Sequence, residues 1–346
     1  MRPGGRRYRR VLIALAVLLV ASVALAVAVG AVWIPPATAA RLVAWRVGIG
    51  SRPDVPHSTE VILFQLRLPR VLLAAVVGLG LGVSGALFQG LFRNPLADPA
   101  IIGVSSGAAL GAVAVIVLGG SAAFGGLGVS FAAFVGALLT AFLVYRLARI
   151  GPTVHVATLL LAGIAVAAVI SSAMSLAMSF AGEDVRNIYF WLLGGLGARG
   201  WTSLEIVTPL VAVGVLGAAA LVPDLNLVSL GEERAAQLGV DVDRFKTAAV
   251  ALGSLLAGAA VSVSGVIGFV GLMTPHVLRL VVGSDHRRLL PAVMLAGPAF
   301  LILADLAART ALAPQELPIG AVTALLGGPF FLYLLRRERR RANALA

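Results

Sequence analysis

Side chains that could bind a metal ion, hold a phosphate or act as a nucleophile are scarce in this sequence. The histidines form neither an H-E-x-x-H motif nor another spacing typical of zinc ligands. They are His57, His155, His276 and His286. The only lysine, Lys246, follows Phe245, whereas the lysine of a G-x-x-x-x-G-K-S/T phosphate loop follows glycine. Cysteine is absent, which excludes disulfides and thiolate metal sites. We therefore predict no metal site, no cofactor and no catalytic residue.

One acidic residue could couple transport to an ion gradient. Transporters driven by protons or sodium usually keep an acid at mid-depth in the membrane, because such a costly charge is retained only for coupling. Asp305 is the best candidate, but it lies late in its apolar run and four residues before Arg309, where an i,i+4 ion pair is expected. This pattern weakens the interpretation as an ion-driven transporter and favours a partner chain as the energy source.

The composition requires lipid as the main solvent. The chain has 346 residues, of which 60% are hydrophobic and 12% are charged, and soluble domains usually carry about twice that charged fraction. The mean hydropathy is +1.00. The net charge of +12 does not indicate a nucleic-acid partner, because the arginines stand between apolar runs and at both termini, as in residues that orient membrane spans.

Ten apolar runs predict an all-α integral membrane protein with a single ten-helix domain over residues 1–346. A helix needs about 20 apolar residues to cross roughly 30 Å of hydrocarbon. The runs lie at residues 11–34, 68–92, 101–118, 129–148, 154–178, 201–222, 247–263, 266–282, 289–307 and 317–335. A cleaved signal peptide is the alternative for the first run, but that run is longer than the roughly 7–15 apolar residues typical of one.

The positive-inside rule places both termini in the cytoplasm. Basic tails are predicted at residues 1–10 and 336–346, flanking a bundle over residues 11–335. Residues 223–246 form the one long cytoplasmic connection and mix acidic with basic side chains. Residues 35–67 and 180–200 are predicted to be long loops on the outer side.

Six stretches carry further information. They are R-L-P-R at 67–70; G-L-G-L-G-V-S-G at 78–85, followed by Gln89; N-P-L-A-D-P at 94–99 with G-V-S-S-G-A at 103–108; G-E-E-R-A-A-Q-L-G at 231–239; G-F-V-G-L-M-T-P-H-V-L-R at 268–279; and E-L-P-I-G at 316–320.

The residue types alone give each stretch a local interpretation. Arg67 and Arg70 could reach lipid headgroups or acidic side chains of a docking protein. The glycines at 78–85 allow close helix packing, and the prolines at 94–99 predict a sharp cytoplasmic turn. Residues 231–239 predict a short helix ended by glycine, either solvated or docked on a partner. Pro275 predicts a kink.

Together the six stretches, which occur in family order from Arg67 to Leu335, closely resemble the FecCD-type permeases. These are the membrane subunits of type II ABC importers for ferric siderophores, haem and cobalamin. The resemblance implies two permease subunits, identical or related, around a translocation path. It also implies two cytoplasmic ATPase subunits as partners and an extracytoplasmic substrate-binding protein.

The resemblance also implies roles for particular residues. Docking of the binding protein is expected at Arg67, Arg70 and Arg309. Coupling to the ATPase is expected at Gly231, Glu232, Glu233, Arg234, Ala235, Ala236 and Gly239. The translocation path is expected near Gly82, Ser84, Gln89, Asn94, Pro95, Ser105 and Ser106.

Family frequency ranks a ferric siderophore first as cargo, with cobalamin or haem as alternatives. The alternatives from other classes are an ion-driven secondary transporter and a structural or sensory membrane subunit without transport.

Overall fold

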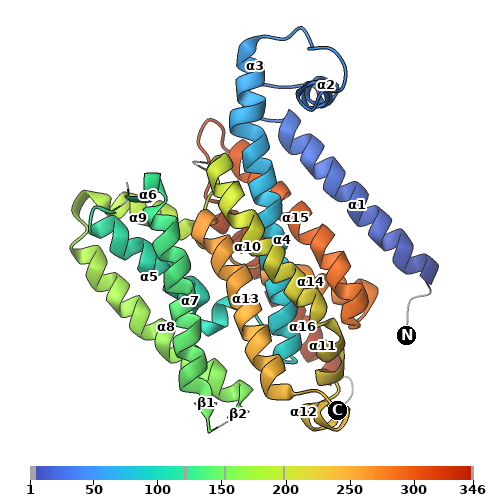
Figure 1. Ribbon diagram of the computed structural model, residues 1–346, viewed down its shortest axis with the longest axis vertical. Helices are drawn as coiled ribbons and strands as arrows, with labels where there is room; N and C mark the ends of the chain where they lie inside the picture. Colours follow the sequence, from blue (N-terminus) through green and yellow to red (C-terminus); the bar gives the residue numbers. More distant parts are fainter. Residues whose placement is uncertain (1–4, 121–122, 152, 198, 344–346) are drawn as a thin grey trace.

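Apolar runs of this length form helices because an α-helix satisfies all its backbone hydrogen bonds internally, which lipid cannot do. The computed structural model describes residues 5–120, 123–151, 153–197 and 199–343 and is a helix bundle with one short β-hairpin (Figure 1). The hairpin pairs β1 (Arg149–Ile150) with β2 (Thr153–Val154) in antiparallel fashion. The predicted basic tails lie partly outside the described residues, at 1–4 and 344–346.

Within the described part of the chain, ten apolar helices follow one another in the order predicted from the sequence. Seven are long enough to span a membrane: α1 (Gly5–Ala28), α4 (Leu68–Leu91), α7 (Gly128–Ala148), α8 (Val156–Ser179), α10 (Trp201–Ala220), α13 (Val242–Ser264) and α15 (His286–Thr310). Three have shorter apolar segments: α5 (Val104–Val117), α14 (Val270–Val282) and α16 (Ile319–Asn343). The first run begins earlier than predicted, since its arginine-rich flank is also helical.

The connections contain more helix than the sequence predicted. The expected loop at 35–67 holds α2 (Pro36–Arg46), α3 (His57–Val61) and the π-helix η1 (Ile62–Arg67), which leads directly into α4. The remaining short elements are α6 (Ala123–Gly126), η2 (Pro99–Ile102), η4 (Gly182–Asp184), α9 (Val185–Leu193), α11 (Val222–Val228) and α12 (Glu232–Gln237). We call the end that carries α12 and the hairpin the inner end, and the end that carries α2 and α3 the outer end (Figure 1).

Helix α4 is the buried centre of the bundle, in contact with α10, α13, α14 and α15. Its glycines bring backbones together, as the sequence predicted. A Cβ on Gly78 would lie 2.8 Å from the carbonyl carbon of Gly297 on α15, and one on Gly85 would lie 2.7 Å from Cα of Gly271 on α14. Such distances leave no room for a methyl group, so glycine is required at both contacts.

The Gly85 contact gives a testable prediction. Gly85→Ala should lower the free energy of unfolding by at least about 1–3 kcal/mol, because α4 and α14 must move apart to admit the methyl group. Thermal unfolding in detergent measures the loss. Gly328→Ala on α16 is the matched control: nothing lies within 4 Å of its Cβ position, so alanine should be neutral or stabilising by up to about 1 kcal/mol. Equal melting temperatures for the two variants would contradict this packing.

Two helices are much less covered than α4. In the most apolar windows of α1 and α8, only 22% and 17% of the residues are buried, against 78% for the segment that includes α4. The two helices lie at opposite sides of the molecule (Figure 1). Their exposed faces therefore meet lipid or another subunit.

Candidate functional site

The predicted short helix at residues 231–239 is present at the inner end. Two glycines with positive φ bracket α12, Gly231 at +118° and Gly239 at +89°. Within α12, Ala235 is fully buried, whereas Glu233, Arg234 and Ala236 are exposed. A glycine tolerates positive φ without steric cost, so the chain turns sharply into and out of α12 and presents it as a separate surface helix.

Glu232 differs from its neighbours because it holds α12 in place. Its Oε2 lies 2.6 Å from Nζ of Lys246 on α13, and the same ammonium donates to the carbonyl of Val154 in β2 at 2.7 Å. Lys246 is only 5% exposed. One buried lysine thus ties α12, α13 and the hairpin together. The sequence analysis missed this role, although a lone lysine in an arginine-rich chain was a visible signal.

Exposed leucines flank α12 and were also missed. Leu230 is 55% exposed and Leu238 is 60% exposed. Leu230 also lines a cleft of about 600 Å³ between α11 and the connection from α14 to α15, together with Leu227, Asp285 and Arg287. Apolar side chains on a polar surface are typical of a protein-docking site.

Three residues expected beside the translocation path, Gly82, Ser84 and Gln89, are buried inside the subunit. Ser84 Oγ donates to the carbonyl of Gly253 at 2.7 Å, and Gln89 Nε2 donates to that of Leu272 at 3.0 Å. Gly82 packs against Val293. Polar groups in an apolar interior need such partners, so these side chains join α4 to its neighbours. All three residues are therefore covered within the subunit and do not lie open at its surface.

The other four expected path residues lie near the inner turn or on α5. Asn94 is exposed, and its Oδ1 accepts a hydrogen bond from the N–H of Leu96 at 2.9 Å, which confirms the predicted turn. The carbonyl of Pro95 lies 3.2 Å from Nδ1 of His276 on α14. Ser105 and Ser106 are half-buried in the first turn of α5.

Helix α8 carries an exposed serine face that the sequence analysis did not single out. Ser171, Ser172, Ser175 and Ser179 are all exposed. The hydroxyl of Ser172 donates to the carbonyl of Ala168 at 3.1 Å, and that of Ser175 donates to the carbonyl of Ser171 at 3.0 Å. Four hydroxyls within nine residues of an apolar helix were a readable signal for a surface that is not wholly apolar.

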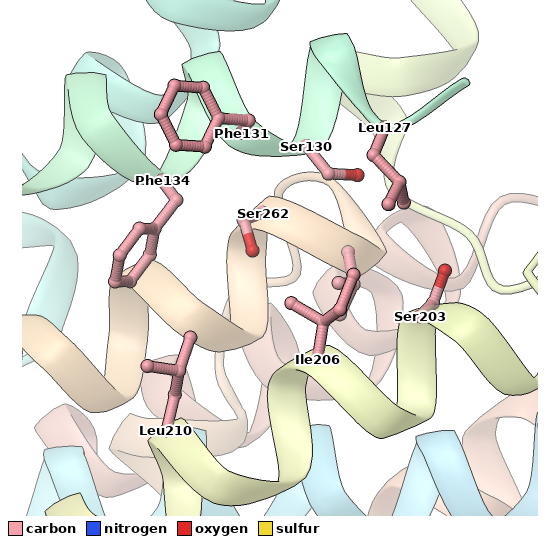
Figure 2. Close-up of a pocket in the computed structure, with 9 residues that line it drawn as sticks. Leu127, Ser130, Phe131, Phe134, Ser203, Ile206, Leu210 and Ser262 are labelled. Atoms are coloured by element: carbon pink, nitrogen blue, oxygen red, sulfur yellow. The ribbon is translucent and has the colours of Figure 1, made fainter. Parts of the chain in front are cut away.

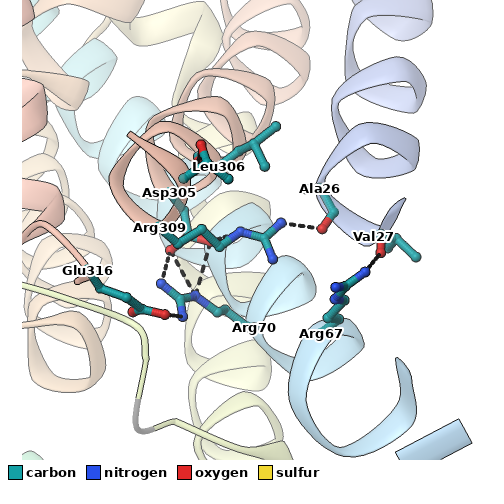
Figure 3. A network of polar contacts seen from close by, with 9 residues as sticks. Ala26, Val27, Arg67, Arg70, Asp305, Leu306, Arg309 and Glu316 are labelled. Atoms are coloured by element: carbon teal, nitrogen blue, oxygen red, sulfur yellow. Dashed lines mark hydrogen bonds and ion pairs between the residues drawn. The ribbon is translucent and has the colours of Figure 1, made fainter. Parts of the chain in front are cut away.

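The outer end holds a network of charged side chains (Figure 3). Arg70 at the start of α4 pairs with Asp305 on α15 and with Glu316 before α16, each at 2.9 Å. Arg309 Nε lies 3.8 Å from Asp305, as the i,i+4 spacing predicted. Asp305 is 1% exposed. The acid proposed for ion coupling is therefore the centre of a structural ion-pair network.

The two other arginines expected to dock the binding protein, Arg67 and Arg309, bind the C-terminal part of α1. Arg67 donates to the carbonyls of Val27 at 2.7 Å and Ala28 at 2.9 Å, and Arg309 donates to that of Ala26 (Figure 3). Arg67 is 6% exposed. Unpaired carbonyls at a helix end need donors, and these guanidinium groups supply them. The structure therefore brings Arg67, Arg70 and Arg309 together as expected, but it does not present Arg67 to a partner.

Comparisons with known proteins agree over nearly the whole chain. A family model described as the FecCD transport family matches residues 18–337. A cobalamin import system permease of Halobacterium salinarum is 48% identical over 83% of this chain and 77% of its own length. A hemin transport system permease of Yersinia pestis is 43% identical over 82% of this chain and 85% of its own length. A vitamin B12 import system permease of Klebsiella pneumoniae is 40% identical over 97% of this chain and 96% of its own length.

Solved structures show the same fold. An inward-facing transporter described as a metal-chelate type ABC transporter superposes with a TM-score of 0.82 at 32% identity, covering 95% of this chain and 99% of its own. PsaBC from Streptococcus pneumoniae, solved in complex with a Fab, gives a TM-score of 0.54 at 18% identity over 79% of this chain and 92% of its own. The second likeness concerns the fold alone.

Proposed function

The chain belongs to the FecCD transport family as a permease subunit of ABC importers, and from this premise we propose that it carries a bulky metal chelate, with cobalamin first among the candidates. The relative that is 48% identical is named for cobalamin import, and others are named for vitamin B12 or hemin. None of these names supports the sequence-based ranking of a ferric siderophore first. A siderophore stays the alternative cargo.

The inner end supports docking of a separate ATPase. The observation that carries this proposal is the pair of exposed leucines beside a helix held rigidly by Lys246 and Glu232. A docked ATPase would cover Leu230 and Leu238, and its movement would pass through α12 into α13 as a rigid body. Residues 231–239 are thus proposed as the coupling element, with the leucines added to the residues expected from the sequence.

We propose that the translocation path runs along the serine face of α8 and is completed by a second permease subunit. Exposed hydroxyls are out of place against lipid tails but suit a wet path. The buried Ser84 and Gln89 then keep the helices in register behind the wall. Cytoplasmic termini and a location in the bacterial plasma membrane are part of this proposal, because they put α12 on the side where ATP is available.

Transport assays in proteoliposomes test the proposed function. The chain should be reconstituted with its ATPase and binding protein and given labelled cobalamin, haem or a ferric siderophore. ATP-dependent uptake of cobalamin is expected, with no uptake driven by a proton or sodium gradient alone. Gradient-driven uptake would instead support the ion-driven class, which the pairing of Asp305 with Arg70 disfavours.

We further propose that the binding protein docks over the network at the outer end, where Arg70 keeps an 11% exposed side chain and Glu316 is 50% exposed. An acidic group of the partner would compete with Glu316 for Arg70. Glu316→Gln should therefore strengthen docking by roughly 1.5–5-fold at low salt, as expected for a partly exposed ion pair, and less at high salt. Binding measured at two salt concentrations checks this.

A second glutamate provides the control for the docking prediction. Glu60 pairs with Arg52 at 2.7 Å within the segment that precedes α4. Glu60→Gln removes the same charge without freeing Arg70 and should leave docking unchanged. Weaker docking in Glu316→Gln would mean that the partner presents basic rather than acidic groups.

A further inference from the structure

An apolar crevice opens in the outer half of the bundle between α7, α10 and α13, away from the coupling helix. Its volume is about 200 Å³. Its apolar lining includes Phe131 and Phe134 of α7, Leu210 of α10 and Val263 of α13. Below it, Gly258 of α13 faces Ala137 of α7 so closely that a Cβ on the glycine would lie 3.1 Å from the Cβ of Ala137. The two helices are in contact at that point.

Two of the three serines that line this crevice lie at one end, and the third, Ser262, donates its hydroxyl to the carbonyl of Ala259 on its own helix. Ser130 on α7 and Ser203 on α10 lie beside Leu127, whereas Phe134 and Leu210 lie at the opposite end (Figure 2). Ser130 and Ser203 belong to the first turns of their helices. The crevice is therefore amphipathic along its length, with a polar mouth at the outer end and an apolar interior towards the middle of the bundle.

Arg199 brings a positive charge to this mouth. Its Nη1 lies 3.5 Å from Oγ of Ser130, and among the described residues no carboxylate forms an ion pair with it. Burial lowers the pKa of the Arg199 guanidinium. Arg199 also lines an outer cleft of about 460 Å³ that contains Asn187 and Glu316, and Glu316 is paired with Arg70.

The helix ends at the mouth add to the positive potential. No side chain caps the N-terminus of α7 at Leu127 or that of α10 at Gly200. The free N–H groups and the dipole of a helix N-terminus favour an anion. An arginine and two uncapped N-termini therefore converge above an apolar crevice. A phosphodiester joined to an acyl chain complements this arrangement, whereas a free anion would leave the crevice unfilled.

We propose that the crevice between α7, α10 and α13 binds one acyl chain of an outer-leaflet glycerophospholipid, whose phosphodiester is held by Arg199. The chain lies along Phe134 and Leu210, and the headgroup occupies the outer cleft. The bound lipid fills the crevice between α7, α10 and α13. This lipid would thus be a structural component of the bundle and not part of the bulk membrane.

Lipid binding to the purified permease–ATPase complex tests this proposal. Native mass spectrometry should find about one retained phospholipid per permease chain. Arg199→Gln should weaken binding of added dioleoyl-phosphatidylglycerol by about tenfold, because a charge-assisted hydrogen bond is lost, and Arg199→Lys should keep most of it. Arg186→Gln is the matched control: this exposed arginine of α9 lies over the ring of Phe190, at 5.8 Å, and its loss should change nothing.

Two further ligands test the contributions of the headgroup and of the acyl chain separately. Dioleoylglycerol lacks the phosphate, so its binding should be the same in wild type and Arg199→Gln. Inorganic phosphate lacks the chain and should not protect the complex against heat at millimolar concentration. The proposal would be overturned if wild type and Arg199→Gln bound phosphatidylglycerol equally well. It would also be overturned if inorganic phosphate protected the complex against heat as well as phosphatidylglycerol does. A disulfide-linked pair of permease chains in the Phe131→Cys variant would overturn it too, since this face would then be an interface between two copies of the chain.

Discussion

Asp305→Ala is expected to lower the free energy of unfolding by about 3–5 kcal/mol, the usual cost of removing one partner from a buried ion pair. The side chains of Arg70 and Arg309 are only 11% and 8% exposed, and both face the Asp305 carboxylate. Without it, two guanidinium groups repel each other in an environment with little water. Unfolding in detergent, followed by loss of helix signal, measures the change.

Two further variants test whether the unpaired charge causes the loss of stability in Asp305→Ala. Glu316→Gln removes an acid that is 50% exposed, and this change should cost less than about 1 kcal/mol. Replacing Asp305 by leucine together with Arg70 and Arg309 by methionine removes all three buried charges. Because apolar groups of similar volume often substitute for buried ion pairs without loss, the triple variant should recover the stability lost in Asp305→Ala, less the contribution of the hydrogen bond that Arg309 donates to the carbonyl of Ala26. If Asp305→Ala unfolds like the wild type, the network does not stabilise the bundle.

Leu238→Asp should reduce copurification of the ATPase by at least tenfold, which corresponds to about 1.4 kcal/mol. Leu238 is 60% exposed beside α12, so the substitution should not disturb the fold of the isolated chain. In the assembled transporter it would place a carboxylate in an apolar contact without a partner, and such burial is costly. ATP-dependent uptake should fall in parallel with ATPase binding.

Gln237→Asp provides the matched control for Leu238→Asp. The two positions are adjacent and exposed, and both substitutions add one negative charge. Only Leu238→Asp removes an apolar contact. If both variants lose the ATPase equally, charge rather than apolar burial governs docking, and if neither loses it, the leucine surface is not the ATPase site.

Several features of the fold follow from the sequence because they depend on local chemistry. The length of each apolar run determines whether a helix can cross the membrane, and the ten described apolar helices match the ten runs. Residues with particular local backbone preferences also determined where short helices end and where the chain turns. Gly239 ends α12 with a positive φ, and the side chain of Asn94 stabilises the turn that precedes α5. Four-residue spacing on one helix likewise predicted the pairing of Asp305 with Arg309.

Which side chains face a partner was decided only by the tertiary structure. Arg67 looked available at a helix mouth, but carbonyls of α1, 39 and 40 residues earlier in the chain, accept its hydrogen bonds. Ser84 looked like a residue of the path, but a carbonyl of α13 lies within its reach. A polar side chain inside a membrane protein takes whichever partner packing brings near. That partner can be far away in the sequence, so residue type and spacing determine where a helix lies in the chain but not which of its faces is buried.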